Sequence, residues 1–518
     1  MTLTSQSPKN DTPNTIGKSI TTFFQTHPIA LILLAATAVF TFRLGHEGLW
    51  VDELFSVRDA SYDSLAGVYA ASTVRPLYYF ILHFWMGVST HDVWLRSLSV
   101  IAALVAVFLI YRLGRRLAGE TEGLIAAALL ATSPLFVNHT QEVRMYALSL
   151  CLGLAGTLFL AHALLGQTEE VAQTAPTELS IRPHSPSRKT IIGWLVFRLL
   201  AILTVPLNLT LLIPDALLVL FRFRRQPKEL LRFTAAFISI LLLWSPIVFT
   251  LLGVLDPSSD YAAERADFAA APGLNNLVYP LKFWMVLPFV TNLGPVAHNF
   301  YRLFTLLIAG LVGAGLLYKR RAAALPWTCA WFILPLIPII AFSLLSARIW
   351  EPRYVLFVSP YLFILTAAGF ARLWKHWKTA AIVTTLTYVL GIGVALGHYY
   401  TIQNRGDYRF NLETIEANEQ PGDALFWSYP RDMALDHYYD GNADIFSNSG
   451  RDVDSPETMR QWLSEFPSTY ERAWLVIEKG RKVEEFFADV VSETYNIEQQ
   501  FEYGHNSYVL LVTPKVSP

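Results

Sequence analysis

The chain has 518 residues, of which 53% are hydrophobic and only 16% are charged. Soluble domains average about 45–50% apolar and about 25% charged residues, so this composition excludes an ordinary soluble protein and indicates a polytopic membrane protein. The net charge of −1 gives no sign of nucleic-acid binding, but residues 404–518 alone hold 21 acidic and 10 basic residues. The chain therefore combines a basic membrane body with an acidic, water-soluble tail.

Apolar runs long enough to cross a membrane recur from residue 28 onward. A spanning helix needs about 20 mainly apolar residues. We expect about eleven spans, near 28–44, 94–112, 123–139, 146–165, 190–205, 208–222, 231–252, 301–318, 325–345, 354–372 and 379–397. Residues 1–27 are polar and no small-residue cleavage site follows the first run, which predicts a cytoplasmic N-terminal tail rather than a signal peptide.

Lysine and arginine gather in alternate loops, such as "YRLGRR" at 111–116, "FRFRRQPKELLR" at 221–232 and "ARLWKHWK" at 371–378. Loops rich in these residues usually face the cytoplasm. The remaining loops, including 45–93 and 253–300, are then expected outside, together with the C-terminal tail. The stretch "DPSSDYAAERADFAAAPG" in loop 253–300 also predicts a mobile segment that could close over a site and exclude water.

Two charges interrupt apolar runs between residues 190 and 222. Arg198 and Asp215 each lie eight residues from the turn at Pro206 and Leu207, which puts both about 12 Å below that turn. A charge at the centre of a spanning helix costs about 2.5–3.5 kcal/mol on insertion scales, so each needs a partner. We expect a buried ion pair between them; the alternative is a proton or substrate path.

Residues 400–518 predict a small α/β domain. The segments "DALFWSY", "AWLVIE" and "SYVLLVT" are typical of strands. The segments "SPETMRQWLSEF" and "VEEFFADVVSETY" have helical spacing, and Ser455 is placed to cap the first of them.

The stretch "HEGLWVDELFS", residues 46–56, places Asp52 and Glu53 directly after the first apolar run. Trp50 and Phe55 flank them and suggest a loop packed at the membrane surface. Partial desolvation makes a carboxylate a better base at neutral pH. Neighbouring residues on an extended loop point apart, so one acid could face a reacting group while the other holds the loop or a cation. The alternative is a pair of solvated loop residues.

Two further stretches place charges at expected outer ends of spans. "NHTQEVRMYALS" holds Glu142 and Arg144, which could take part in a site or only cap a helix end. "SARIWEPRYVLFVSPYL" holds Arg348 and Arg353 on the side where arginines are disfavoured. A guanidinium can bind a phosphate through two N–H donors, so an anionic ligand would explain them, although an ion pair with Glu351 would also do so.

Four segments in order resemble one enzyme family: "LWVDELFS", "RPLYYFILHFW", "YRLGRRLAGETEGLIAAALLATSPLFVNHTQEVRMYAL" and "PRYVLFVSPYLFILTAAG". They are similar to the bacterial GT-C membrane glycosyltransferases of the family-39 type, which are protein-mannosyltransferase-like or ArnT-like. The resemblance covers most of 28–400, and the tail, residues 400–518, resembles the extracytoplasmic α/β domain of many relatives. It implies a GT-C transmembrane domain at 28–399 with a catalytic outer loop at 45–93.

The resemblance implies an enzyme that takes a sugar from a polyprenyl-phosphate carrier. The sugar goes to a protein, lipid or glycan acceptor at the outer face of the bacterial cytoplasmic membrane. The family's catalytic carboxylate maps to Asp52, with Glu53 beside it, and Glu142 is a further catalytic candidate. Relatives have two prolines before "LYY", whereas here the first is Arg75, an added cation near the site.

The chemistry that we expect is a single displacement with inversion, in which Asp52 takes the proton of the acceptor. Arginines would stabilise the phosphate that leaves. The candidates for this role are Arg58, Arg75, Arg144, Arg348 and Arg353. No nucleotide cofactor is expected, and the sequence leaves a divalent cation open.

Two other function classes stay open at this point. One is a secondary transporter, although we find neither a clear internal repeat nor a midplane site. The other is a non-catalytic sensor or scaffold whose tail binds a ligand. Membrane lipids are expected partners in every case, and nucleic acid in none.

Overall fold

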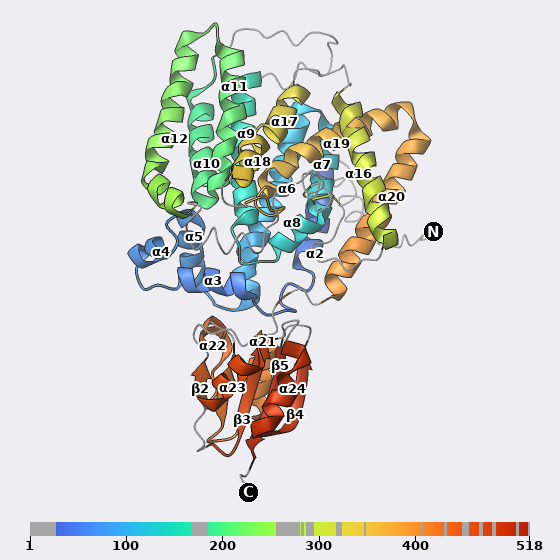
Figure 1. Ribbon diagram of the computed structural model, residues 1–518. Coiled ribbons are helices and arrows are strands. Elements are labelled where there is room, and N and C mark those ends of the chain that lie inside the picture. Colours follow the sequence, from blue (N-terminus) through green and yellow to red (C-terminus); the bar gives the residue numbers. More distant parts are fainter. Residues whose placement is uncertain are drawn as a thin grey trace, which may run out of the picture. The chain divides into compact units, whose positions relative to one another are not determined.

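The computed structural model describes most of the chain as helices and one small sheet (Figure 1). The described residues are 27–166, 185–254, 280, 284–285, 295–316, 324–345, 349–402, 405, 408–428, 432–447, 455–465, 470–478, 483–503 and 507–515. The expected mobile loop, 253–300, therefore lies largely outside the described residues. The chain forms two compact units: unit 1 comprises 1–42, 100–140 and 145–395, and unit 2 comprises 43–99, 141–144 and 396–518.

Unit 1 is helical. Its elements are α2 (Pro28–Thr41), α7 (Glu120–Thr132), α8 (Pro134–Thr140), α9 (Tyr146–Leu165), α10 (Arg188–Thr204), η2 (Pro206–Leu211), α11 (Leu212–Phe223), α12 (Pro227–Val254), α16 (Pro295–Leu316), α17 (Ala324–Ile333), α18 (Leu336–Leu345), η4 (Leu356–Val358) and α19 (Ser359–His376). Most of α6 (Asp92–Leu117) and of α20 (Lys378–Thr401) also belongs to it, while the first turns of α6 and the end of α20 belong to unit 2.

The expected count of eleven spans is not confirmed. Among the described residues, seven helices or helix pairs are long and apolar enough to cross a membrane, or eight if the bent pair α7–α8 is one span. Helix α2 has only 14 residues, α10 has only 17, and α7 and α8 meet at 63°. The structure therefore gives fewer candidate spans than the sequence because several of the predicted apolar runs form short or bent helices.

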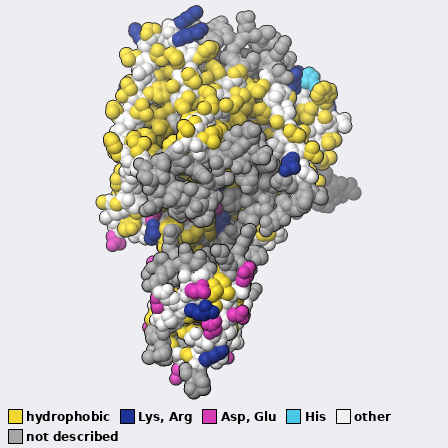
Figure 2. Space-filling model, in the orientation of Figure 1, with side chains coloured by type: hydrophobic (Ala, Val, Ile, Leu, Met, Phe, Trp, Pro, Cys, Tyr) yellow, Lys and Arg dark blue, Asp and Glu magenta, His cyan; other side chains and the backbone are white. Residues whose placement is uncertain are grey.

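The surface of unit 1 fits a lipid environment. Large apolar side chains are exposed along α12 and α20, among them Leu242, Phe249 and Leu390. Figure 2 shows hydrophobic side chains over much of the visible helical body, whereas most of the visible acidic side chains lie on the C-terminal domain. Apolar patches of this extent are rare on soluble monomers, which supports a multi-pass membrane protein.

Unit 2 begins with three short helices, α3 (Val51–Ala60), α4 (Leu65–Ala71) and α5 (Pro76–Met86). Its C-terminal domain, residues 408–515, contains α21 (Tyr408–Asn418), β1 (Ala424–Trp427), α22 (Met433–Tyr438), β2 (Asp444–Ser447), α23 (Pro456–Ser464), β3 (Ala473–Glu478), η5 (Val483–Glu485), α24 (Phe487–Thr494), β4 (Tyr495–Tyr503) and β5 (Ser507–Pro514). The strand order is β2-β1-β3-β5-β4. Strand β1 is parallel to β2 and β3, and β5 is antiparallel to β3 and β4.

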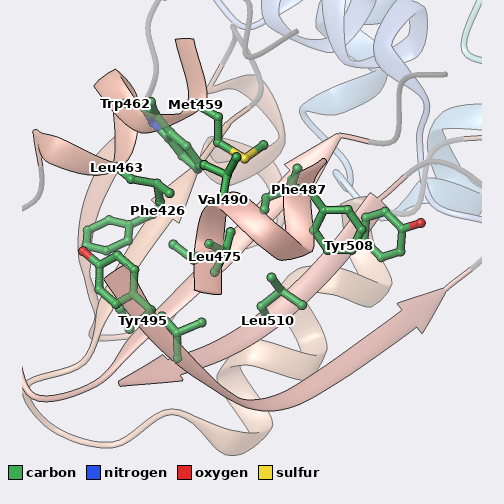
Figure 3. Close-up of a cluster of buried hydrophobic side chains, with 14 of the residues drawn as sticks. Phe426, Met459, Trp462, Leu463, Leu475, Phe487, Val490, Tyr495, Tyr508 and Leu510 are labelled. Carbon is green, nitrogen blue, oxygen red and sulfur yellow. The ribbon is translucent and has the colours of Figure 1, made fainter. Parts of the chain in front are cut away.

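The sheet carries helices on both faces. Figure 3 shows side chains of α23 and α24, including Trp462 and Phe487, packed with Leu475 and Leu510 of the sheet. On the other face α21 is held by a hydrogen bond from Asn411 Nδ2 to Ser507 Oγ at 2.6 Å. Two packed faces explain why the central strands are continuous apolar runs.

The α/β expectation for the tail is confirmed in its central elements. The three predicted strands are β1, β3 and β5, and Ser455 caps α23 by accepting a hydrogen bond from Thr458 N. Strands β2 and β4 were not predicted, because they lie at the sheet edges and carry polar residues at many positions. Such edge strands lack the apolar pattern that identifies a strand.

The predicted buried pair between Arg198 and Asp215 is confirmed. Both side chains are fully buried, and Arg198 Nε lies 2.8 Å from Asp215 Oδ2. Asp215 also accepts hydrogen bonds from the indole N–H groups of Trp194 and Trp331, both at 2.8 Å. Arg198 donates further to Gly153 O at 3.1 Å. One carboxylate thus joins α10, α11 and α17, and its arginine reaches α9.

We predict that Asp215→Ala destabilises the protein by about 3–5 kcal/mol, because it leaves a buried guanidinium without its counter-ion. Adding Arg198→Met should recover only part of this loss, since Trp194 and Trp331 keep buried donors without an acceptor. The measurement is thermal unfolding in detergent. Leu217→Ala on the exposed side of α11 is the control. A double variant no more stable than Asp215→Ala would contradict the pairing.

Candidate active site

The two adjacent acids lie in the first turn of helix α3 rather than in the extended loop that was expected. Trp50 precedes the helix in an extended conformation, and its backbone N–H donates to Glu53 Oε2 at 3.2 Å. Successive residues of a helix point about 100° apart. Asp52 and Glu53 therefore face different surroundings, as the sequence indicated. The cause is the rotation between successive residues of a helix, whereas the sequence argument assumed an extended loop.

Glu53 is the centre of a buried polar cluster and is fully buried. Arg96 of α6 binds both carboxylate oxygens through Nε and Nη2, at 2.9 and 2.8 Å. Oε1 also accepts from Val143 N at 2.8 Å, and Oε2 accepts from Arg405 Nη1 at 3.3 Å. Three segments far apart in the sequence thus meet on one carboxylate.

Arg405 follows α20 and stays charged in this cluster. Burial alone would lower its pKa, but Glu53 and then Tyr399, Glu142 and Glu47 outweigh it, so the pKa of Arg405 is raised above its ordinary value. Its guanidinium also donates to the backbone carbonyl of Gln141. The cluster therefore places two buried guanidinium groups, those of Arg96 and Arg405, around the Glu53 carboxylate.

Asp52 occupies a different environment. Its side chain is 26% exposed, and Oδ2 lies 3.5 Å from Arg144 Nη2. Arg144 is itself nearly buried, and its Nη1 donates to Asp52 O at 2.8 Å and to Ser56 Oγ at 3.1 Å. Ser99 Oγ holds the turn that carries Arg144, because it contacts the carbonyls of Glu142 and Arg144. Asp52 is thus a positioned carboxylate that solvent or a ligand can reach.

Two buried polar atoms of unit 2, on Trp50 and Tyr78, are suited to hydrogen bonding. The indole N–H of Trp50 is buried and has no acceptor within the described part of the chain. The Tyr78 hydroxyl on α5 is fully buried, and burial followed by the neighbouring Tyr79 raises its pKa well above the ordinary value. Tyr78 therefore keeps its proton and acts as a neutral hydroxyl. Most buried polar groups in proteins have a hydrogen-bond partner, so both atoms are candidates for contact with water or a ligand.

The other predicted cations have different surroundings. Arg58 is exposed on α3 and pairs with Asp59 at 2.7 Å. Arg75 stands at the N-cap of α5 and is half-buried. Arg353 belongs to unit 1, where its guanidinium lies 5.4 Å from the centre of the Tyr354 ring. Arg348 lies outside the described residues. Within unit 2, Arg144 is the predicted cation that lies beside Asp52.

A cavity of about 30 Å³ lies behind the Glu53 cluster, lined in part by Arg43, Glu47 and Arg405. This volume suits a water molecule rather than a sugar. Among the described residues, no group of three or more His, Cys, Asp or Glu side chains is arranged to hold a metal ion. The requirement for a divalent cation therefore stays open.

Arg96 and Arg405 were not identified from the sequence. Arg96 lies near the start of the apolar run "DVWLRSLSVIAALVAVFLI", so the argument that found Arg198 would also have shown that it needs a partner. Arg405 lies 352 residues from Glu53. No local pattern predicts a contact over that separation.

We predict that Glu53→Gln and Asp52→Asn differ sharply in stability. Glu53→Gln takes the carboxylate partner from buried Arg96 and leaves buried Arg405 with the more distant Glu47, so it should cost about 3–5 kcal/mol of unfolding free energy. Asp52→Asn removes one partly exposed ion pair and should cost less than about 1 kcal/mol. Thermal unfolding of both variants in detergent is the measurement. Equal losses would show that Glu53 is not the structural centre of the cluster.

The sequence was compared with protein families and with curated proteins. Residues 73–171 match the family described as dolichyl-phosphate-mannose-protein mannosyltransferase. This range contains Arg96, Glu142 and Arg144 but not Asp52 or Glu53. A comparison of the sequence with curated proteins found no match.

Several solved structures share the fold. ArnT from Cupriavidus metallidurans, solved in the apo state and bound to undecaprenyl phosphate, is 13% identical, with a TM-score of 0.53. The match covers 94% of this chain and 98% of ArnT. The arabinofuranosyltransferase AftD from Mycobacteria is 14% identical, with a TM-score of 0.52, and the match covers 94% of this chain and 41% of AftD.

The oligosaccharyltransferase of Archaeoglobus fulgidus is 10% identical, with a TM-score of 0.51 and coverage of 94% of this chain and 74% of that enzyme. These proteins are GT-C glycosyltransferases. The resemblance that the motifs indicated is confirmed at the level of the fold: the chain has the architecture of the GT-C membrane glycosyltransferases.

Proposed function

We propose that this protein is a membrane glycosyltransferase that moves a sugar from a polyprenyl-phosphate donor to an acceptor, with Asp52 as the catalytic base. The proposal depends on the different environments of the two acids in the first turn of α3. Glu53 is buried and held by two arginines, whereas Asp52 is 26% exposed and lies beside Arg144. The shared fold supports the same reading, since ArnT was solved with undecaprenyl phosphate bound.

The reaction is a single displacement at the anomeric carbon. The acceptor oxygen or nitrogen forms a bond to that carbon while the carbon–oxygen bond to the phosphate breaks. Asp52 receives the proton that the acceptor loses, and the lipid phosphate leaves with the electron pair. Attack opposite the leaving group inverts the anomeric centre. Positioned proton transfer of this kind contributes about 10²–10⁴-fold to a rate.

The leaving phosphate needs cations rather than a proton donor. Arg144 is placed to serve near Asp52 because its guanidinium is nearly buried there, and buried charge-assisted hydrogen bonds are strong. Arg58, Arg75, Arg348 and Arg353 remain proposed members of the phosphate site. The Trp50 indole N–H, buried without an acceptor in the described residues, would suit a sugar hydroxyl or a phosphate oxygen.

The finer assignments are also proposals. The acceptor is a protein, lipid or glycan. The enzyme would work at the outer face of a bacterial cytoplasmic membrane, with residues 1–27 in the cytoplasm, 28–399 forming the transmembrane domain and 400–518 outside. The lysine and arginine bias of the loops supports this orientation. No nucleotide is needed, because the phosphate-linked donor already carries an activated sugar.

We predict that Asp52→Asn lowers transfer by at least about 10²-fold while leaving donor binding and thermal stability nearly unchanged, because it removes only the proton acceptor. The assay uses purified protein with a panel of polyprenyl-phosphate sugars, with and without a chelator. Asp63→Asn, which changes an exposed acid shortly after the same helix, is the matched control and should keep full activity. Normal turnover in Asp52→Asn would end the assignment.

A separate prediction concerns the phosphate. Arg353→Ala should weaken donor binding by about 10-fold or more, which corresponds to one lost charge-assisted hydrogen bond. Binding of a polyprenyl-phosphate sugar to the purified protein is the measurement. Arg302→Ala, an exposed arginine on α16, serves as the control. If Arg353→Ala and the control bind the donor equally well, Arg353 has a structural role only.

A further inference from the structure

The segment that leads into α3, residues 44–49, is held at every backbone carbonyl from 44 to 48 by two arginines. Arg96 of α6 donates to the carbonyls of Leu44, Glu47 and Gly48, at 2.8, 2.7 and 2.8 Å. Arg409 of the C-terminal domain donates to those of Gly45 and His46, at 3.1 and 3.0 Å. We call residues 44–49 the approach segment. It has no regular structure of its own, so its shape depends on these contacts.

The C-terminal domain makes a second contact at the last residue of the approach segment. Leu49 N donates to the hydroxyl of Tyr438, at the end of α22, at 2.6 Å. The next residue, Trp50, begins the cap of α3, which carries Asp52 and Glu53. Tyr438 therefore acts on the backbone three residues before the proposed base.

Asp92 joins these contacts to α6. It is 4% exposed and accepts from Arg409 Nη1 at 2.9 Å. It also accepts from the Tyr438 hydroxyl at 3.0 Å, and His437 Nε2 lies 3.4 Å away. Burial and then the charge of Asp92 raise the pKa of Tyr438, so its hydroxyl keeps the proton that it donates. We call Asp92, Arg409 and Tyr438 the latch.

The helix that carries Arg409 of the latch packs against the sheet of the C-terminal domain. Arg409 lies on α21, which is tied to β5 by the hydrogen bond from Asn411 to Ser507. The ring of Tyr408 packs 6.2 Å from that of Trp427 on β1. Arg409 thus lies on a helix that is packed against the sheet of the C-terminal domain.

We propose that the C-terminal domain positions the proposed base, and that Arg409 and Tyr438 are positioning residues for Asp52. Neither touches the reacting atoms. They fix the approach segment and hence the start of α3. The catalytic consequence rests on the proposed function, whereas the mechanical consequence, a fixed approach segment, does not.

The first test measures hydrogen exchange of backbone amides in the full-length protein in detergent. In Tyr438→Phe, which removes one oxygen atom, the Leu49 amide loses its acceptor and peptides covering 44–50 should exchange at least about 10-fold faster. Peptides from β1, β3 and β5 should be unchanged. Arg460→Ala, which breaks an exposed pair with Glu493 in the same domain, should alter neither region. Unchanged exchange at 44–50, or an equal rise in β3, would overturn the proposal.

The second test is kinetic. Tyr438→Phe and Arg409→Lys should lower kcat by about 10- to 100-fold with KM for a polyprenyl-phosphate sugar changed less than about 2-fold, because misplacing a catalytic group by about 1 Å can cost about 10²-fold. Arg460→Ala should match the unmodified protein. Unaltered kcat in both latch variants would overturn the positioning role. If no variant and no parent protein transfers sugar, the proposed function fails, while the exchange result still decides whether the latch exists.

Discussion

Unit 2 depends on the ionic cluster around Glu53. A carboxylate removed from water is stable only if cations and hydrogen-bond donors replace its solvent, and here Arg96, Arg405 and the backbone N–H of Val143 do so. Each partner comes from a different part of the chain, so satisfying one charge brings three segments together. The turn that carries Arg144 and the end of α20 are both placed by this requirement.

The burial of Glu53 also determines what its neighbour can do. Both acids lie in the first turn of α3, where a helix favours negative charge. With Glu53 directed into the cluster, the helical rotation of about 100° per residue turns Asp52 toward Arg144 and the surface. Two adjacent acids on one helix can therefore have different environments, with the Glu53 carboxylate buried among arginines and the Asp52 carboxylate partly exposed.

The sequence predicted those features that follow from a local residue pattern with a clear energetic reason. Arg198 and Asp215 were paired because an isolated charge in an apolar helix is too costly, and β1, β3 and β5 were found because buried strands are apolar. The helical form of α3, the edge strands and the latch were missed. Arg409 and Tyr438 are over 300 residues from the approach segment, and nothing in their own neighbourhoods marks them as its partners.

Two buried carboxylates, Asp215 and Glu53, are held by the same kind of interaction but have different consequences. Asp215 is surrounded by Arg198 and two tryptophans, and the helices that it joins gain a fixed packing. Glu53 is surrounded by two arginines and backbone N–H groups, and its cluster continues through Arg96 into the approach segment, whose remaining carbonyls accept hydrogen bonds from Arg409. Contacts from the C-terminal domain and from α6 therefore both restrain the backbone that leads into the first turn of α3. A base must be held within a fraction of an ångström to be effective, so such support on two sides of Asp52 is what the proposed chemistry requires.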